Sequence, residues 1–144
     1  MPKNKIPKSE NFASSKTPKN IVNPNSYYSK SPSWRFSKAD NEHERWSFTK
    51  NDVFGDMDIV GRLSDFEKQV WQDIIGDRNH FIDTHRLIKE ARDRMVDLGL
   101  YYDSVFSLTL NGRERIFGIM EDGVLFFLWY DRKHEICPSP KKHT

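Results

Sequence analysis

Two stretches in the middle of the chain repeat apolar residues at the spacing of an amphipathic helix. The stripe over residues 58–75 consists of Val60, Leu63, Phe66, Val70, Trp71 and Ile74. The stripe over residues 84–98 consists of Leu87, Ile88, Ala91, Met95 and Leu98. Side chains spaced by three and four positions share one face of a helix, so both stretches are predicted to be helices that bury a single face. Gly76 and Gly99 are placed to end them.

The last third of the chain changes to the pattern of strands. Together with a short alternating run near the front, it predicts strands over residues 33–37, 105–110, 113–120 and 124–130. Asn111-Gly112 is a strong hairpin signal between two of these runs. The last run is apolar at nearly every position, so it is expected to be a central strand that is buried on both faces.

These elements follow the order β-α-α-β-β-β, which indicates the α+β class. Because each helix carries one apolar stripe, both helices are expected to pack on one face of an antiparallel sheet. The sheet and helices fall within residues 33–137, a length that suits one domain.

Both ends of the chain are basic, whereas the predicted domain is acidic. Residues 1–32 hold six lysines and one acidic residue, and residues 33–137 hold 15 basic and 20 acidic residues. The first segment is rich in Lys, Pro, Ser and Asn and has few large apolar groups, so it is predicted to be a disordered basic tail. Residues 138–144 are predicted to be a short basic C-terminal tail.

Several classes of protein and site are excluded by composition. The single cysteine, Cys137, rules out an internal disulfide and favours a cytoplasmic location. No apolar run has the length of a membrane helix, so no membrane contact is expected. His80 and His85 lie near two aspartates, but their spacing matches no standard ligand pair, and neither a metal nor a cofactor is predicted.

The order of elements and the cations on the last strands resemble the RelE/ParE superfamily of bacterial toxins. The resemblance covers roughly residues 33–137, and its nearest sequence match is residues 113–119 with residues 129–135. These toxins are small domains in which two helices pack against an antiparallel sheet; many cut messenger RNA on the ribosome without metal, and others poison gyrase. The pattern Arg-Ile-x-Gly with Leu-Trp-x-Asp-x-x-His is also similar to that of uncharacterised bacterial proteins.

In the nuclease members, an arginine on the penultimate strand and basic or histidine residues after the last strand surround the scissile phosphate. Arg115, Lys133 and His134 are the corresponding positions here. The resemblance implies a metal-independent endoribonuclease, neutralised by an antitoxin protein, in which His134 transfers a proton and Arg115 clamps the phosphate. Lys133 would stabilise developing charge and Asp131 would orient the His134 ring.

Two further readings stay open. His134 and its charged neighbours are also typical of a solvated strand exit, and Arg115 next to Glu114 is typical of a cross-strand ion pair. The acidic body favours a non-catalytic module that binds RNA, the ribosome or a protein, with the basic tail as a tether. Either way, the predicted RNA contacts include Arg113 and the tail lysines Lys3, Lys5, Lys8, Lys16 and Lys19.

Overall fold

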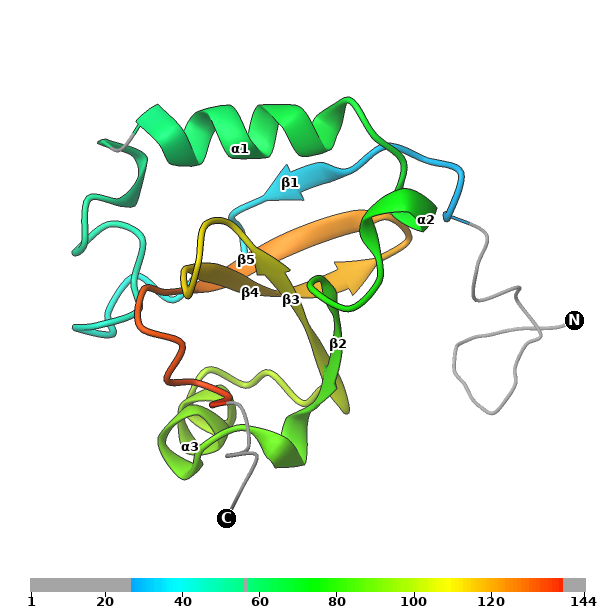
Figure 1. The fold of residues 1–144 in the computed structure, drawn as a ribbon. Helices are drawn as coiled ribbons and strands as arrows, with labels where there is room; N and C mark the ends of the chain where they lie inside the picture. Colours follow the sequence, from blue (N-terminus) through cyan, green and yellow to red (C-terminus); the bar gives the residue numbers. More distant parts are fainter. Residues whose placement is uncertain (1–26, 56, 139–144) are drawn as a thin grey trace, which may run out of the picture.

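The computed structural model describes residues 27–55 and 57–138 and shows a five-stranded sheet with helices on two sides (Figure 1). The strands are β1 (Ser33–Arg35), β2 (His80–Asp83), β3 (Ser104–Thr109), β4 (Arg115–Glu121) and β5 (Val124–Asp131). The helices are α1 (Met57–Glu67), α2 (Trp71–Ile74) and α3 (Lys89–Asp97), with short 3-10 turns η1 (Val53–Gly55) and η2 (Thr84–Arg86). The α+β class predicted from the sequence is confirmed.

The strand order is β1-β5-β4-β3-β2, and the sheet is mixed. Strands β2 to β5 pair antiparallel with their neighbours, but β1 pairs parallel with β5, with Trp34 opposite Leu125. The expectation of a purely antiparallel sheet is therefore wrong. No hairpin joins β1 to β5, because residues 36–79 lead from β1 to β2 at the opposite edge of the sheet. A parallel pairing with β5 is therefore open to β1.

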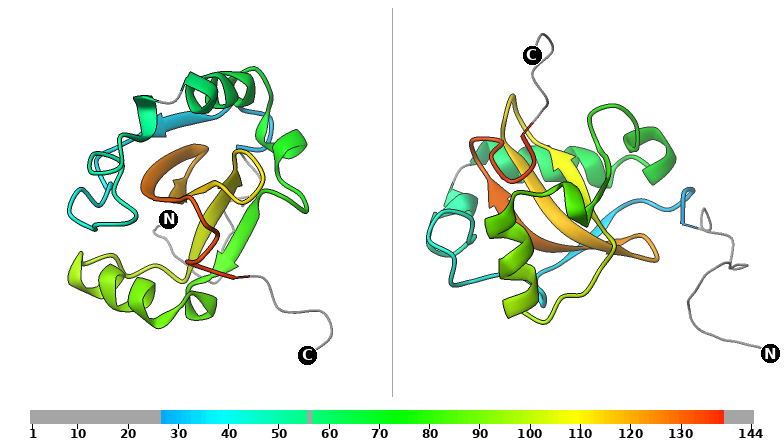
Figure 2. Two further views of the ribbon diagram at one scale, coloured as in Figure 1. Left: turned by 60° about the vertical axis from the view of Figure 1, so that its left-hand side comes forward. Right: turned by 90° about the horizontal axis from the view of Figure 1, so that it is seen from below.

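The helices cover opposite faces of the sheet, which corrects the prediction that both pack on one face. Ile59, Leu63 and Phe66 of α1 belong to one core cluster with Ile116 of β4, whereas α3 contributes to a second cluster with Phe117. Since Ile116 and Phe117 are neighbours on one strand, their side chains point to opposite faces. Figures 1 and 2 show α1 and α3 on either side of the sheet.

The apolar stripe over residues 58–75 belongs to two helices rather than one. The helix α1 ends at Glu67, and the chain resumes as α2 at Trp71, which is fully buried. The Trp71 backbone N–H donates to the carbonyl of Lys30 at 2.9 Å, and its indole N–H donates to the carbonyl of Gly123 at 2.7 Å. These contacts fix Trp71 against the β4–β5 turn, which a continuous straight helix would not reach.

The second predicted helix is also shorter than its stripe. Residues 84–86 form η2, and α3 begins only at Lys89. Just before η2, residues 80–83 form the edge strand β2, which pairs with β3 so that His80 lies opposite Ser107. The sequence pattern did not predict this strand, and it proves central to the candidate site.

The folded unit begins before residue 33. The carbonyl of Tyr28 accepts a hydrogen bond from the Gln72 backbone at 3.0 Å, and Tyr27 packs against the first core cluster. The prediction of disorder is therefore wrong for residues 27–32. The rest of the predicted basic tail, residues 1–26, lies outside the described residues, as do residues 139–144. Among the described helices, none combines the length and the apolar character needed to cross a membrane.

Candidate functional site

A pocket of about 280 Å³ opens at the β2 side of the sheet, where three distant parts of the chain meet. We call it the arginine pocket after its three arginines, Arg78, Arg86 and Arg115, which line it together with the histidines His80 and His134. Their chain positions explain why a sequence motif does not reveal them. In chain order, the first three of these five residues come from β2 and the turns on either side of it, whereas Arg115 begins β4 and His134 follows β5.

The arginine pocket holds cations without acidic partners. Within the described residues, none of the guanidinium groups of Arg78, Arg86 and Arg115 forms an ion pair, although other cations such as Arg94 and Lys89 do. Burial lowers the pKa of Arg115, the nearby Asp131 opposes this shift, and Arg78 adds to it. Three arginines that line one pocket without forming ion pairs are typical of a site for an anion, because an anion would relieve their mutual repulsion.

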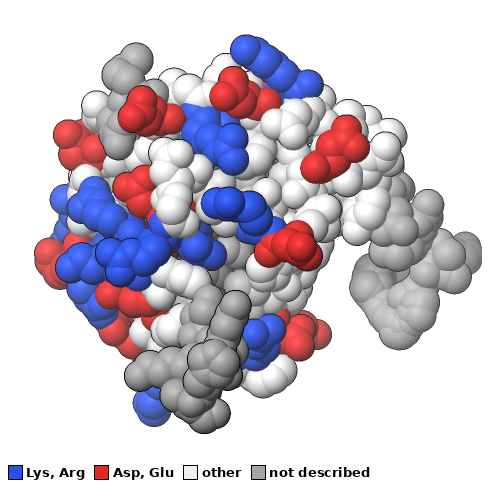
Figure 3. All heavy atoms as spheres, in the orientation of Figure 1, with Lys and Arg blue, Asp and Glu red and all other residues white. Residues whose placement is uncertain are grey.

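The charge of this region contrasts with the acidic body of the protein. On the face that Figure 1 presents, Lys and Arg side chains lie among Asp and Glu side chains, so the surface as a whole is of mixed charge (Figure 3). In the arginine pocket itself, Asp77 is the one carboxylate among the described lining residues. The local excess of positive charge therefore lies at the pocket, not over the whole domain.

His134 enters the pocket from a turn with an unusual backbone. Its φ is +58°, a left-handed value that non-glycine residues rarely adopt. The turn is held by the fully buried Asp131, whose carboxylate accepts hydrogen bonds from the backbone N–H of Glu135 at 3.0 Å and of Ile136 at 2.9 Å. Asp131 thus holds the backbone around His134. Its carboxylate accepts these hydrogen bonds from the backbone, whereas the sequence had predicted that it would orient the His134 ring.

The electrostatic surroundings of His134 favour a neutral ring. Burial lowers the pKa of His134, and the positive charges of Arg115 and Arg113 lower it further, against the opposing effect of Asp131. A neutral imidazole near neutral pH can accept a proton. Arg113 does not line the pocket, but it lies close enough to contribute to this effect.

Only part of the predicted set of cations gathers in one place. Arg115 and His134 line the arginine pocket, as the resemblance implied, but Lys133 lines a separate hollow with Arg45 and Trp46. Because consecutive residues of the turn project in different directions, Lys133 and His134 serve different surfaces. The five tail lysines named above lie outside the described residues.

The structure adds three residues that the sequence analysis did not place in the site: Arg78, His80 and Arg86. The histidine was considered only with His85, which lines a different surface hollow. No group of three or more possible metal ligands occurs among residues 27–55 and 57–138. The one signal that pointed to this region was the cluster of His and Asp residues around position 80.

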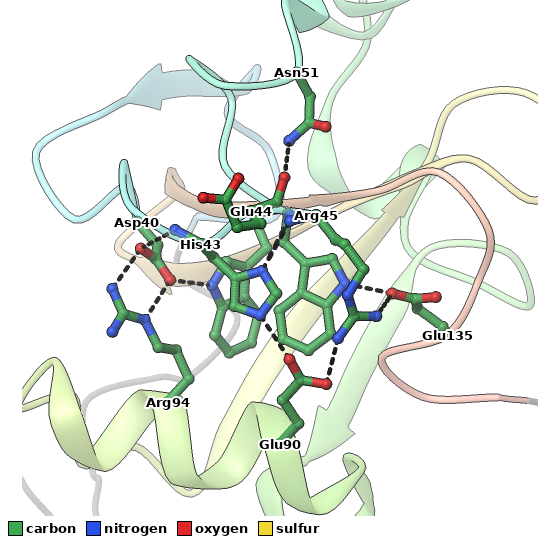
Figure 4. A network of polar contacts seen from close by, with 10 residues as sticks. Asp40, His43, Glu44, Arg45, Asn51, Glu90, Arg94 and Glu135 are labelled. Atoms are coloured by element: carbon green, nitrogen blue, oxygen red, sulfur yellow. Dashed lines mark hydrogen bonds and ion pairs between the residues drawn. The ribbon is translucent and has the colours of Figure 1, made fainter.

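A second concentration of polar side chains, shown in Figure 4, has a structural role. Asp40 is almost fully buried and accepts two hydrogen bonds from Arg94, both at 2.8 Å, and one from the Trp129 indole at 2.9 Å. Burial alone would raise the pKa of Asp40, but the hydrogen bonds from Arg94 and Trp129 hold it well below its usual value. Each polar group is satisfied, so this cluster ties the loop before α1 to α3 and β5.

The other half of the same network is built around His43. Its ring stacks on Trp46 with centroids 4.0 Å apart, and its Nε2 lies 2.9 Å from a carboxylate oxygen of Glu90. Nδ1 accepts hydrogen bonds from the backbone N–H groups of Arg45 and Trp46, both at 3.2 Å. Arg45 also forms ion pairs with Glu90 and Glu135. These side chains are all engaged with one another, so we assign them no ligand.

Comparison with known proteins gives no match: neither a protein-family model, nor a curated protein, nor a solved structure is similar to this chain. The resemblance to RelE/ParE toxins therefore stays a prediction. The arrangement that suggested it, two helices on one face of an antiparallel sheet, is not the arrangement observed.

Proposed function

We propose that the protein is a metal-independent, toxin-like endoribonuclease that binds the RNA backbone in the arginine pocket. The observation that carries this proposal is that Arg78, Arg86 and Arg115, which form no ion pair within the described residues, line one pocket together with His134. A volume of about 280 Å³ corresponds to roughly nine water molecules, so a phosphate group has room in it.

The chemistry assigned to these residues follows from their charge. Arg115 can hold two phosphate oxygens through parallel hydrogen bonds, and Arg78 and Arg86 stabilise the charge that builds up on the phosphate. His134, with its lowered pKa, accepts the proton of the 2′-hydroxyl as that oxygen attacks the phosphorus. Lys133 and Asp131 are not assigned catalytic roles, because Lys133 lies outside the pocket and Asp131 holds the His134 turn.

The substrate in this proposal is messenger RNA, free or on the ribosome, in the bacterial cytoplasm. A neutralising protein partner would act by presenting carboxylates to the three arginines, since those groups lack acidic partners within the described chain. No metal is needed, because arginines supply the positive charge.

Expression in a bacterial host tests the proposal. The wild-type chain should arrest growth and produce new RNA 5′ ends, detected by primer extension, and purified protein should cut RNA in the presence of a chelator. Arg115→Ala and His134→Ala should each lower cleavage about 100-fold or more, because each removes a direct contribution to the transition state.

Lys133→Ala is the matched control for these variants. It removes a cation next to His134 in sequence but outside the arginine pocket, so it should cleave RNA at close to the wild-type rate. The proposal is refuted if wild-type expression leaves growth normal and cellular RNA intact, and if the purified protein cuts no RNA either with or without ribosomes.

A second function, RNA or ribosome binding without cleavage, is favoured by the six lysines of residues 1–32. Deleting residues 1–26, which removes five of these six lysines and leaves Lys30, tests it without disturbing the packed Tyr27 and Tyr28. If the lysines are the main contact, the deletion should weaken RNA binding and reduce its salt dependence. Unchanged binding by the shortened chain would exclude the tether.

A further inference from the structure

Two histidines, from different elements, line the arginine pocket. His80 is the first residue of the edge strand β2 and is half-buried, and His134 lies in the turn after β5. The other two described histidines are placed differently: His43 is stacked and hydrogen-bonded inside the polar network, and His85 is exposed and lines another hollow. The fold therefore brings two of its four described imidazoles to the same cationic pocket.

Resting on the proposed nuclease function, we infer that His80 is a second catalytic residue, the general acid that completes the reaction begun by His134. In this step His134 takes the proton from the 2′-hydroxyl, and the bond between O2′ and phosphorus forms. The bond between phosphorus and O5′ breaks, and His80 gives a proton to O5′. The products are a 2′,3′-cyclic phosphate and a 5′-hydroxyl, so atoms and protons balance without a co-reactant.

The division of roles follows from the groups that lie near His134. Metal-free cleavage needs a proton acceptor and a proton donor, and histidine is the side chain that ordinarily titrates nearest to neutral pH. Arg115 and Arg113 lie near His134 and disfavour its protonated form, which suits the acceptor. Two other lining groups are unsuited to donate: burial raises the pKa of the Cys137 thiol, and the Thr109 hydroxyl donates at 2.6 Å to the carbonyl of Arg78.

The decisive test replaces the leaving oxygen. A short RNA is made with sulfur in place of O5′ at the mapped cleavage position, because a thiolate leaves without being protonated. The oxygen and sulfur substrates, alone and with ribosomes, are given to four proteins: the wild type, His80→Ala, His134→Ala and His85→Ala. The control His85→Ala removes a nearby exposed imidazole outside the pocket.

We expect His80→Ala to cut the oxygen substrate 100-fold or more slowly and the sulfur substrate within a few-fold of wild type. His134→Ala should be slow on both, and His85→Ala should match wild type. His80→Gln, which keeps a polar side chain on β2, should behave like His80→Ala and guards against a folding defect.

The outcomes separate this inference from the proposed function. If His80→Ala cuts the oxygen substrate at the wild-type rate, or stays slow on both substrates, His80 is not the acid although the protein is a nuclease. If sulfur rescues His134→Ala and not His80→Ala, the two roles are reversed and the assignment fails. If the wild type cuts neither substrate, the nuclease function itself fails.

Discussion

Replacing His134 with glycine should stabilise the protein while it removes a residue of the arginine pocket. A left-handed backbone costs an L-residue roughly 1–2 kcal/mol, and His134 has a φ of +58°. Glycine adopts this conformation freely but adds roughly 0.5–1 kcal/mol of backbone entropy to the unfolded state. The net expectation for His134→Gly is a gain of up to about 1.5 kcal/mol in the free energy of unfolding, with a central value of about 0.75 kcal/mol, which is a rise in Tm of about 3–6 °C.

Urea unfolding, followed by tryptophan fluorescence, measures this change, and Lys133→Gly is the matched control. Lys133 occupies the same turn without a positive φ, so glycine there should lower the free energy of unfolding by about 0.5–1 kcal/mol. Opposite signs for the two substitutions would indicate that the backbone at His134 is strained, as residues of functional sites often are. If both variants lose the same stability, the reasoning is refuted.

Three further predictions concern the charged groups. Inorganic phosphate at 100 times its Kd should stabilise the wild type by about 2.7 kcal/mol in thermal unfolding, and Arg115→Ala, but not Lys133→Ala, should abolish this gain. Asp40→Ala should lower the free energy of unfolding by about 3–5 kcal/mol, because it leaves Arg94 partly buried without its partner; a loss below about 1 kcal/mol would contradict this. The pKa of Asp40 is lowered in the folded state, so the contribution of its carboxylate to the free energy of unfolding is complete above its ordinary pKa of about 3.9. This contribution is lost as the pH falls below that value. The difference in free energy of unfolding between wild type and Asp40→Asn should therefore shrink below about pH 4.

The strands of the last third could be predicted because their signals are local. The expected strands over residues 105–110, 113–120 and 124–130 match β3, β4 and β5 within two residues at each end. Such hairpins are determined by the alternation of apolar and polar residues and by the turn residues between the strands, and all of these lie within a few positions of one another in the chain. Gly112 and Gly123 both take positive φ values, +53° and +86°, at the two turns between these strands.

The placement of the helices could not be predicted from their stripes, because an apolar stripe does not say which face of a sheet it covers. The sequence held one relevant signal, the nearly continuous apolar run of β5. A strand buried on both faces needs cover on both faces, and here α1 and α2 supply one layer and α3 the other. Combining this signal with the two stripes would have predicted the observed arrangement.

The candidate site was predictable only where it depends on the hairpins. Arg115 and His134 lie at the start of β4 and just beyond β5, and the pairing of Arg115 with Asp131 brings these two ends together. The other side of the pocket depends on β2, whose four residues are too few to show a period. Without that strand, nothing in the sequence connects Arg78, His80 and Arg86 to the hairpin.

The end of the described chain has a practical consequence for any laboratory that purifies this protein. Pro138 forms part of the pocket wall, and just before it the carbonyl of Ile136 accepts a hydrogen bond from Ile88 at 2.9 Å. A purification tag attached after Thr144 is separated from this lining residue by only the six residues 139–144. Polyhistidine at that position would add imidazoles a short length of chain away from a pocket that is proposed to work with histidines, so activity measurements call for a removable tag or one at the other terminus.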